Sequence, residues 1–133
     1  MKLSTKTRYA MRFKVFLAEH HGQGWIAMKE IAAEEGISKK YLEQVVSPLT
    51  GAGLLEVKRG VAGGFKLARE PEQITLADIM AVSEDGLELM QCLTKFSACS
   101  NMDGCVSKNI WSGLQGAIND YLRSRTLADV ISQ

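Results

Sequence analysis

The sequence predicts a mainly helical protein with one small β hairpin, built as a winged helix-turn-helix followed by a long C-terminal helix. Apolar residues recur at helical spacing along most of the chain, and a glycine-rich turn separates two short strand-like runs. The chain has 133 residues, 46% hydrophobic and 23% charged, which fits a single globular domain. This composition argues against a disordered, collagen-like or purely coiled-coil protein.

The first three predicted helices form a tight helix-turn-helix. The first runs over residues 5–21, and a second, shorter helix ends at Gly36, a residue suited to a left-handed cap. Ser38 then caps a third helix, and only Gly36 and Ile37 separate it from the second, so the two must cross sharply. Pro48 removes a backbone donor late in the third helix, so we expect a kink or an early end there.

Two short strands and a fourth helix should follow. The strands are predicted over residues 54–59 and 65–68, because the connecting residues 60–64 include three glycines that permit a hairpin turn. No Gly-Lys-Ser/Thr follows these glycines, so a phosphate-binding loop is not indicated. Thr75 and Asp78 have the spacing of a capping box and open the fourth helix.

A long amphipathic helix should close the chain. Periodicity is lost over residues 84–104, and an apolar stripe then runs from Val106 to Leu122. Thr126 and Asp129 repeat the capping pattern for a short final turn. The stripe carries more apolar surface than the preceding small unit can cover, which predicts a symmetric dimer. The alternative is that this helix folds back over its own domain.

The two halves of the chain differ in charge. Residues 1–70 hold 12 Lys and Arg against 7 Asp and Glu, whereas residues 71–133 hold 4 against 8. The basic residues that precede the first acid, Glu19, would form one basic face: Lys2, Lys6, Arg8, Arg12 and Lys14. Such a face suits a polyanion, although a solvated helix face explains it equally well.

A basic winged helix points to DNA, because its third helix enters the major groove and its hairpin reaches phosphate or the minor groove. Lys39 and Lys40 would meet phosphates. Gln44 suits adenine edges and Glu43 the cytosine amino group, while Arg59 suits a narrow minor groove. The predicted DNA-binding residues are Lys2, Ser38, Lys39, Lys40, Tyr41, Glu43, Gln44 and Arg59.

All three cysteines, Cys92, Cys99 and Cys105, fall in the stretch without periodicity. Their spacing lacks the Cys-x2-Cys pair of structural zinc sites, and an odd count does not suit a disulfide framework. For zinc, His20 and His21 are a weak supply of a fourth ligand. Three thiolates on a loop can hold an iron–sulfur cluster with a fourth ligand from elsewhere. From spacing alone, a cluster, redox-active thiols and incidental cysteines are equal alternatives.

Other function classes find little support in the sequence. No apolar run is long enough for a membrane span or a signal peptide, so we expect a cytoplasmic protein that does not contact a membrane. No nucleophile with a nearby base and no pair of acids stands in a recognisable enzyme motif. Trp25 and Trp111 are interpreted as core or interface residues.

Several motifs occur in register along nearly the whole chain. They are residues 1–6 with Arg8-Tyr9-Ala10, Gly36-Ile37-Ser38, Tyr41-Leu42-Glu43-Gln44, Gly53-Leu54-Leu55, Arg59-Gly60, Gly63-Gly64-Phe65-Lys66-Leu67 and Thr126-Leu127. In these motifs the chain resembles the Rrf-type winged-helix regulators, which include IscR, NsrR and CymR. The resemblance implies a homodimeric transcription factor, held together by its long helix, that binds a palindromic site on double-stranded DNA.

The resemblance also implies a cofactor. Cys92, Cys99 and Cys105 match the three-cysteine loop of the iron–sulfur members, which implies a 2Fe-2S or a 4Fe-4S cluster. Lys108 stands where IscR-like members place a histidine ligand, and Arg8 where NsrR-like members use an acid. The remaining candidates for the fourth ligand are Asp103, Ser107, Asn109, a small thiol or water.

These observations divide the chain into a DNA-binding domain over residues 1–83, a cluster-binding loop over 84–105, and a dimerisation helix with a C-terminal turn over 106–133. We expect the loop to lie beside the DNA-binding unit, so that a change in the cluster alters the spacing of the two half-site helices. Glu43 would carry this change to the bases, since a carboxylate repels phosphate. The wing lacks the family's usual proline, which Val61 and Ala62 replace. The alternative is a cluster-free regulator of the CymR type that responds through thiols or a partner protein.

Overall fold

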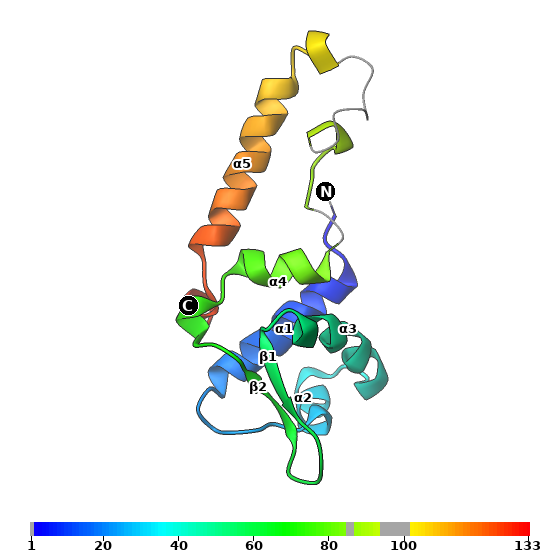
Figure 1. Ribbon diagram of the computed structural model, residues 1–133, viewed down its shortest axis with the longest axis vertical. Helices are drawn as coiled ribbons and strands as arrows, with labels where there is room; N and C mark the ends of the chain where they lie inside the picture. The colour runs from blue at the N-terminus through cyan, green and yellow to red at the C-terminus, as the bar shows by residue number, and fades with distance from the viewer. Residues whose placement is uncertain (1, 85–86, 94–101) are drawn as a thin grey trace.

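The structure is a computed structural model that describes residues 2–84, 87–93 and 102–133 (Figure 1). In chain order its elements are α1 (Thr5–Glu19), α2 (Met28–Glu35), α3 (Lys39–Gly51), β1 (Leu55–Lys58), β2 (Gly64–Leu67), the 3-10 turn η1 (Pro71–Gln73), α4 (Leu76–Ser83), the turns η2 (Gln91–Leu93) and η4 (Met102–Gly104), α5 (Lys108–Ser124) and α6 (Leu127–Ile131). This architecture confirms the predicted mainly helical fold with a two-stranded hairpin.

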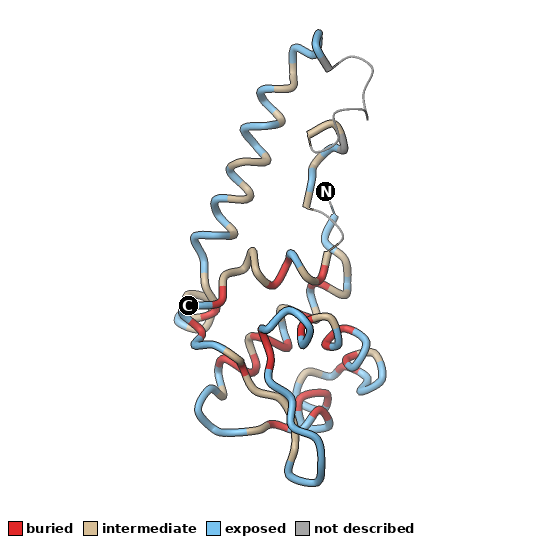
Figure 2. The backbone as a smooth tube through the Cα atoms, in the orientation of Figure 1, coloured by how far each residue is buried: buried red, intermediate tan, exposed pale blue. Residues whose placement is uncertain are grey.

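The core lies around α1, which packs against α3, α4 and α6. Phe13 and Leu17 of α1 are buried with Leu42 of α3 and Ile79 of α4. Phe13 also meets Phe65 of the hairpin edge to face, with ring centroids 5.6 Å apart. We call residues 2–84 together with α6 the winged-helix unit, because all of these elements share this core (Figure 2).

The caps predicted from the sequence set the helix-turn-helix. Gly36 takes a left-handed conformation with φ of 64° after α2, and the Ser38 hydroxyl accepts a hydrogen bond from the Tyr41 backbone N–H at 3.2 Å. α1 ends at Glu19, two residues earlier than predicted, because His20 leaves helical geometry with φ of −106° and ψ of 20°.

α3 does not end early at Pro48, so this part of the prediction is wrong. The helix continues to Gly51. Leu49, directly after the proline, is fully buried in the core. Burial of its side chain stabilises the last turn by about 1.5–3 kcal/mol, which is comparable with the roughly 3 kcal/mol that a proline costs inside a helix.

The wing is an antiparallel hairpin that is anchored close to its turn. β1 pairs with β2 from Leu55 opposite Leu67 to Lys58 opposite Gly64. Phe65 donates its N–H to the Ile26 carbonyl at 2.8 Å, and Ile26 donates back at 3.0 Å. A Cβ on Gly64 would lie 2.3 Å from the Ile26 oxygen, so only glycine allows this close approach.

The end of the chain returns to the winged-helix unit. Capping boxes at Thr75 and Thr126 open α4 and α6, as predicted. The segments before the two helices pair, since Leu76 donates to the Arg125 carbonyl at 2.9 Å and Leu127 donates to the Ile74 carbonyl at 2.9 Å. Leu127 is completely buried, so α6 contributes to the core.

α5 extends away from the winged-helix unit, with the described parts of the preceding segment alongside it (Figures 1 and 2). We call residues 87–93 and 102–124 the projecting arm. No residue of α5 is buried, and Ile110, Leu114 and Tyr121 are 68%, 45% and 55% exposed. The alternative that this helix folds back over its own domain is therefore wrong for the single chain. No helix within the described residues is long and apolar enough to cross a membrane.

Candidate nucleic-acid interface and cysteine segment

α3 separates its side chains into a buried face and an exposed face. Leu42, Val45 and Val46 are buried, whereas the predicted contact residues Ser38, Lys39, Lys40, Glu43 and Gln44 are all exposed. Tyr41 is half-buried, because its ring meets Tyr9 of α1 edge to face with centroids 5.3 Å apart. The structure therefore presents the predicted contact residues of α3 to solvent, apart from Tyr41.

The exposed face of α3 and the wing border one groove, which we call the α3–wing groove. It has a volume of about 470 Å³, and its charged lining residues are Lys29, Lys39, Glu43, Lys58 and Arg59. Four cations against one carboxylate make a surface that attracts phosphate. Lys29 and Lys58 are not among the predicted contact residues, because they lie on α2 and β1 rather than on the helix or turn expected to contact DNA.

The predicted basic face of α1 is wrong at two positions. Arg12 forms an ion pair with Glu35, with Nε and Oε2 2.9 Å apart. Lys14 is completely buried, and its Nζ donates to the Leu54 carbonyl at 2.7 Å. The small buried residues Ala10 and Ala18, one turn before and one turn after, leave space for the lysine side chain.

Burial changes the chemistry of Lys14. Desolvation, with a smaller contribution from the positive charge of Arg69, lowers the pKa of Lys14 from 10.5 to about 7. The ammonium group therefore loses its proton much more readily than that of a surface lysine. Its role is to connect α1 to the start of the wing.

Lys2 and Lys6 remain at the surface near the N-terminus. Lys2 is exposed, whereas Lys6 is half-buried and lines a cavity of about 190 Å³ together with Tyr41, Gln44 and Val45 of α3. The first turn of α1 thus borders the exposed face of α3. Lys6 belongs to the predicted basic face but is not among the predicted DNA-binding residues.

Two of the three cysteines lie in the described part of the projecting arm. Cys92 is half-buried in η2, and Cys105 is exposed directly after η4, and neither forms a disulfide. Cys99 lies outside the described residues. Within the described ranges, no three His, Cys, Asp or Glu side chains are grouped closely enough to hold a metal.

Cys105 has the environment of a stabilised thiolate. Its Sγ lies 3.6 Å from the Ser107 hydroxyl. This hydrogen bond lowers the pKa of Cys105, and the backbone N–H groups of Ser107 and Lys108 and the positive charge of Lys108 add to the shift. A thiolate is the form that binds a metal and that reacts with oxidants.

We call residues 85–105 the cysteine segment. Its described parts, residues 87–93 and 102–105, extend away from the winged-helix unit and do not lie beside it (Figure 1). Its described parts run along α5, and η4 lies at the end of α5 that is far from α1 and α3 (Figure 1). Leu89 donates its N–H to the Gln115 Oε1 of α5 at 2.7 Å, and Gln115 Nε2 donates to the Leu87 carbonyl at 2.9 Å. For the described residues the predicted location is therefore wrong, because these bonds hold Leu87 and Leu89 on α5.

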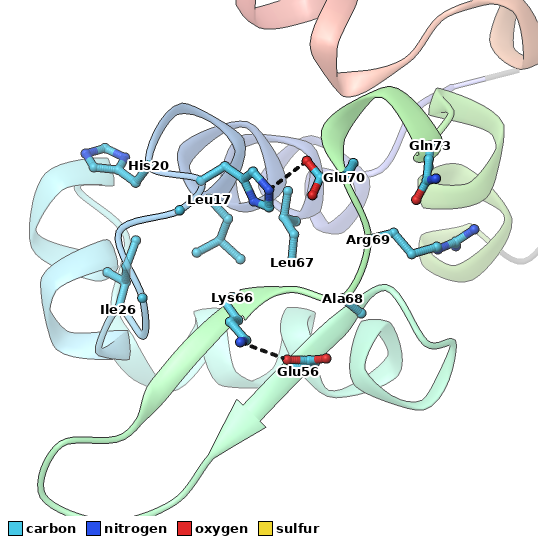
Figure 3. A pocket seen from close by; sticks show the side chains of 13 residues that line it. Leu17, His20, Ile26, Glu56, Lys66, Leu67, Ala68, Arg69, Glu70 and Gln73 are labelled. Atoms are coloured by element: carbon cyan, nitrogen blue, oxygen red, sulfur yellow. Dashed lines mark hydrogen bonds and ion pairs between the residues drawn. The ribbon is translucent and has the colours of Figure 1, made fainter.

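A separate cavity of about 480 Å³ lies where α1 ends, between the wing and η1 (Figure 3). Two ion pairs line it, His21 with Glu70 at 2.9 Å and Lys66 with Glu56 at 3.3 Å. His20 Nδ1 is hydrogen-bonded to the Phe16 carbonyl at 2.8 Å. Both histidines therefore have hydrogen-bond partners at the C-terminal end of α1.

Known proteins resemble this chain over almost its whole length. A family model described as Rrf2, iron-dependent transcriptional regulator, matches residues 3–133. CymR of Bacillus subtilis is 37% identical over 132 residues, which are 99% of this chain and 91% of CymR. IscR of Sodalis glossinidius is 33% identical over 132 residues, which are 99% of this chain and 79% of IscR.

Solved structures share the fold. The structure of CymR, the global cysteine regulator of B. subtilis, aligns with a TM-score of 0.84 and 36% identity, covering 99% of this chain and 97% of CymR. The structure of T. potens IscR aligns with a TM-score of 0.79 and 36% identity, covering 99% of this chain and 87% of IscR.

Proposed function

The chain belongs to the Rrf2 family of transcriptional regulators, and from this premise we propose that it is a cytoplasmic homodimer whose binding to a palindromic operator depends on an iron–sulfur cluster. The family binds DNA and regulates transcription, so the chain is not an enzyme. The observation that carries the cluster proposal is the grouping of Cys92, Cys99 and Cys105 in one segment between α4 and α5.

The proposed dimer pairs α5 with α5 of a second copy. Ile110, Leu114 and Tyr121 lie on one side of the helix and remain exposed in the single chain. Burial of one such side chain contributes about 1.5–3 kcal/mol, so a symmetric contact that covers three from each copy is strongly favourable. The dimer would carry two α3 helices, which must be about 34 Å apart to reach successive major grooves.

The proposed DNA contact uses the α3–wing groove. Lys39 and Lys40 meet phosphates at the start of α3, where the exposed Gln44 reaches base edges. Arg59 of the wing enters the minor groove, and Lys29 and Lys58 add phosphate contacts. Lys2 extends the same basic surface from the N-terminus.

The described cysteines have properties that fit a cluster. The pKa of Cys105 is lowered by the Ser107 hydroxyl, so its thiol readily supplies the thiolate that iron requires. Cys92 is half-buried, which limits its contact with water. We propose Cys92, Cys99 and Cys105 as the protein ligands. When bound, the cluster supplies iron whose loss or oxidation removes constraints on the segment.

The fourth ligand differs from the family's histidine. Lys108 holds that position, and Arg8 holds the position of the acid that other members use. Asp103 and Asn109 are exposed near Cys105, so either side chain, the Ser107 hydroxyl, a small thiol or water is a candidate. A weakly held fourth position would make the cluster sensitive to its surroundings.

A cluster-free regulator of the CymR type is the second candidate function. Two observations favour it: the similarity to CymR, and the activated Cys105 thiol, which suits direct reaction with an oxidant. In that case the thiols or a partner protein supply the signal, while the DNA-binding surface and the dimer stay the same.

Iron and sulfide analysis with an anaerobic visible spectrum distinguishes the two candidates. We expect freshly purified protein to contain both elements and to show thiolate-to-iron charge-transfer bands that disappear in Cys105→Ser and Cys99→Ala. Ser112→Ala, on the exposed polar side of α5, is the matched control and should keep the bands. A colourless protein that cannot be reconstituted but still binds DNA would establish the CymR-type candidate instead.

A further inference from the structure

Glu84 stands at the junction between the winged-helix unit and the cysteine segment. It is the C-cap of α4, where its N–H donates to the Met80 carbonyl at 3.0 Å. Its backbone is extended, with φ of −116° and ψ of 143°, so the chain leaves the helix at this residue. The cysteine segment follows directly in the sequence.

The carboxylate of Glu84 binds the N-terminus of α1. Ser4 donates its backbone N–H to Glu84 Oε1 at 2.7 Å. A hydrogen bond from the Thr7 side chain, together with this Ser4 bond, lowers the pKa of Glu84 below its usual value. Ser4 is the N-cap of α1, and its hydroxyl accepts from the Thr7 N–H at 3.1 Å. Glu84 therefore completes the cap of a helix that lies 80 residues away in the sequence.

The first turn of α1 contacts the recognition helix. Lys6 and the α3 residues Tyr41 and Gln44 line the same small cavity. The rings of Tyr9 and Tyr41 meet with centroids 5.3 Å apart. The position of this turn therefore determines where Lys2 and Lys6 lie relative to the exposed face of α3.

The chain after Glu84 is held at a second point. Gln115 of α5 binds the backbone of Leu87 and Leu89 through both ends of its amide, and its Nε2 also donates to Asn119 Oδ1 at 3.2 Å. Glu84 fixes one side of this connection to α1, and Gln115 fixes the other side to α5. Cys92 follows Leu89 by three residues.

We propose that Glu84 is a positioning residue for DNA binding: it holds the first turn of α1 against α3 and passes displacements of the cysteine segment to the lysines of that turn. The second half rests on the cluster proposed above, whereas the first half does not. On the projecting arm, Gln115 holds the start of the same segment through its hydrogen bonds to Leu87 and Leu89. A displaced segment would pull the carboxylate away from Ser4 and Thr7, and the cap of α1 would open.

The test uses cluster-free, full-length dimer and a palindromic duplex that the wild-type protein selects from a randomised pool. Glu84→Ala should weaken binding at least about tenfold, because a hydrogen bond to a charged group is worth at least about 1.5 kcal/mol. It should also lower the slope of log affinity against log salt by about 1, because a lysine–phosphate contact is lost. Fluorescence anisotropy at several salt concentrations measures both quantities.

Two variants separate positioning from charge. Glu84→Gln keeps an oxygen that accepts from Ser4, so it should bind within about twofold of wild type. Glu88→Ala removes an exposed acid of the same segment and should also bind like wild type. Equal affinity and equal salt slope for Glu84→Ala and wild type would overturn the proposal, as would a Glu84→Gln variant as weak as Glu84→Ala. Circular dichroism confirms that each variant is folded.

The coupling is measured with Gln115→Ala. This variant should leave the cluster-free affinity unchanged and reduce the ratio of cluster-loaded to cluster-free affinity by at least about threefold, since releasing one of these hydrogen bonds is worth roughly 1 kcal/mol. An unchanged ratio overturns the coupling. A protein that never holds iron would refute the cluster, while the Glu84 measurements on cluster-free protein would still decide the positioning role.

Discussion

The winged-helix unit and the projecting arm use their apolar residues in opposite ways. In the unit, residues such as Phe13, Leu42 and Leu127 are fully buried in one core. In the arm, α5 buries no residue, although its apolar stripe is as regular as that of any core helix (Figure 2). The unit is therefore complete in a single chain, whereas the arm has an apolar surface that no described part of the chain buries.

The largest expected effect tests the exposed stripe. Changing Ile110 and Leu114 to aspartate should separate the dimer, because the contact loses two buried side chains from each copy at about 1.5–3 kcal/mol apiece. The dissociation constant should rise by at least about 10⁴-fold, as measured by analytical ultracentrifugation. Ser112→Asp adds the same charge on the polar side of α5 and should remain dimeric. A double variant that stays dimeric contradicts the proposed interface.

The second prediction compares the stability lost at a core residue with that lost at a residue of the apolar stripe of α5. Phe13→Ala should lower the free energy of unfolding by about 3–5 kcal/mol, because it leaves a cavity beside Phe65. Tyr121→Ala is tested in the double variant Ile110→Asp/Leu114→Asp, which should be monomeric. There it should change the free energy of unfolding by less than about 0.5 kcal/mol, because the Tyr121 side chain is half exposed. Urea unfolding measures both values. Similar losses at the two sites would remove the distinction between unit and arm.

The third prediction concerns Lys14 inside the unit. Its folded-state pKa is about 7, below the unfolded value of 10.5, so the unfolded chain binds more protons between these pH values. The free energy of unfolding should therefore rise by about 2 kcal/mol between pH 7.5 and pH 9.5. The limit is set by one extra proton on the unfolded chain, which changes this free energy by at most about 1.4 kcal/mol per pH unit.

Lys14→Met supplies the comparison for this prediction. It keeps a long side chain in the same space but cannot titrate, so the rise in unfolding free energy should be about 2 kcal/mol smaller than in wild type over the same pH range. Urea unfolding at several pH values gives the difference. Parallel pH profiles for the two proteins would show that Lys14 is charged or exposed in the folded state.

The smallest effect is expected at the outer end of the arm. Ser107→Ala removes the hydroxyl that lowers the pKa of Cys105, so Cys105 should react with iodoacetamide about 2–5 times more slowly at pH 7.5. Mass spectrometry of the Cys105 peptide in cluster-free protein gives the rate. Ser112→Ala, farther along α5, should react at the wild-type rate. Equal rates for Ser107→Ala would show that the hydroxyl does not activate the thiol.

Local signals predicted the unit well. The caps at Ser38, Thr75 and Thr126 and the glycines of the wing act within a few residues, so they can be recognised from spacing alone. The predicted basic face includes Lys14 because charge normally indicates exposure, whereas its burial depends on a carbonyl 40 residues away. Such long-range partners leave no periodic pattern in the sequence.

The arm was harder to place for the same reason. Its apolar stripe predicted α5 correctly, but the position of the cysteine segment depends on the side chain of Gln115, a polar residue outside the stripe. Loss of periodicity places Glu84 at the start of the cysteine-containing stretch, whereas its carboxylate binds Ser4, 80 residues earlier in the chain. The connections between the two regions are thus the features that sequence spacing predicts least.

The central claim is that the state of the cysteine segment sets the affinity of the winged-helix unit for DNA. The most direct measurement is the anaerobic dissociation constant for the selected palindromic duplex, with the same preparation in cluster-loaded and cluster-free form. We predict at least a tenfold difference, about 1.4 kcal/mol, that disappears in Cys105→Ser. Equal affinities for a fully loaded and a cluster-free protein would contradict the claim.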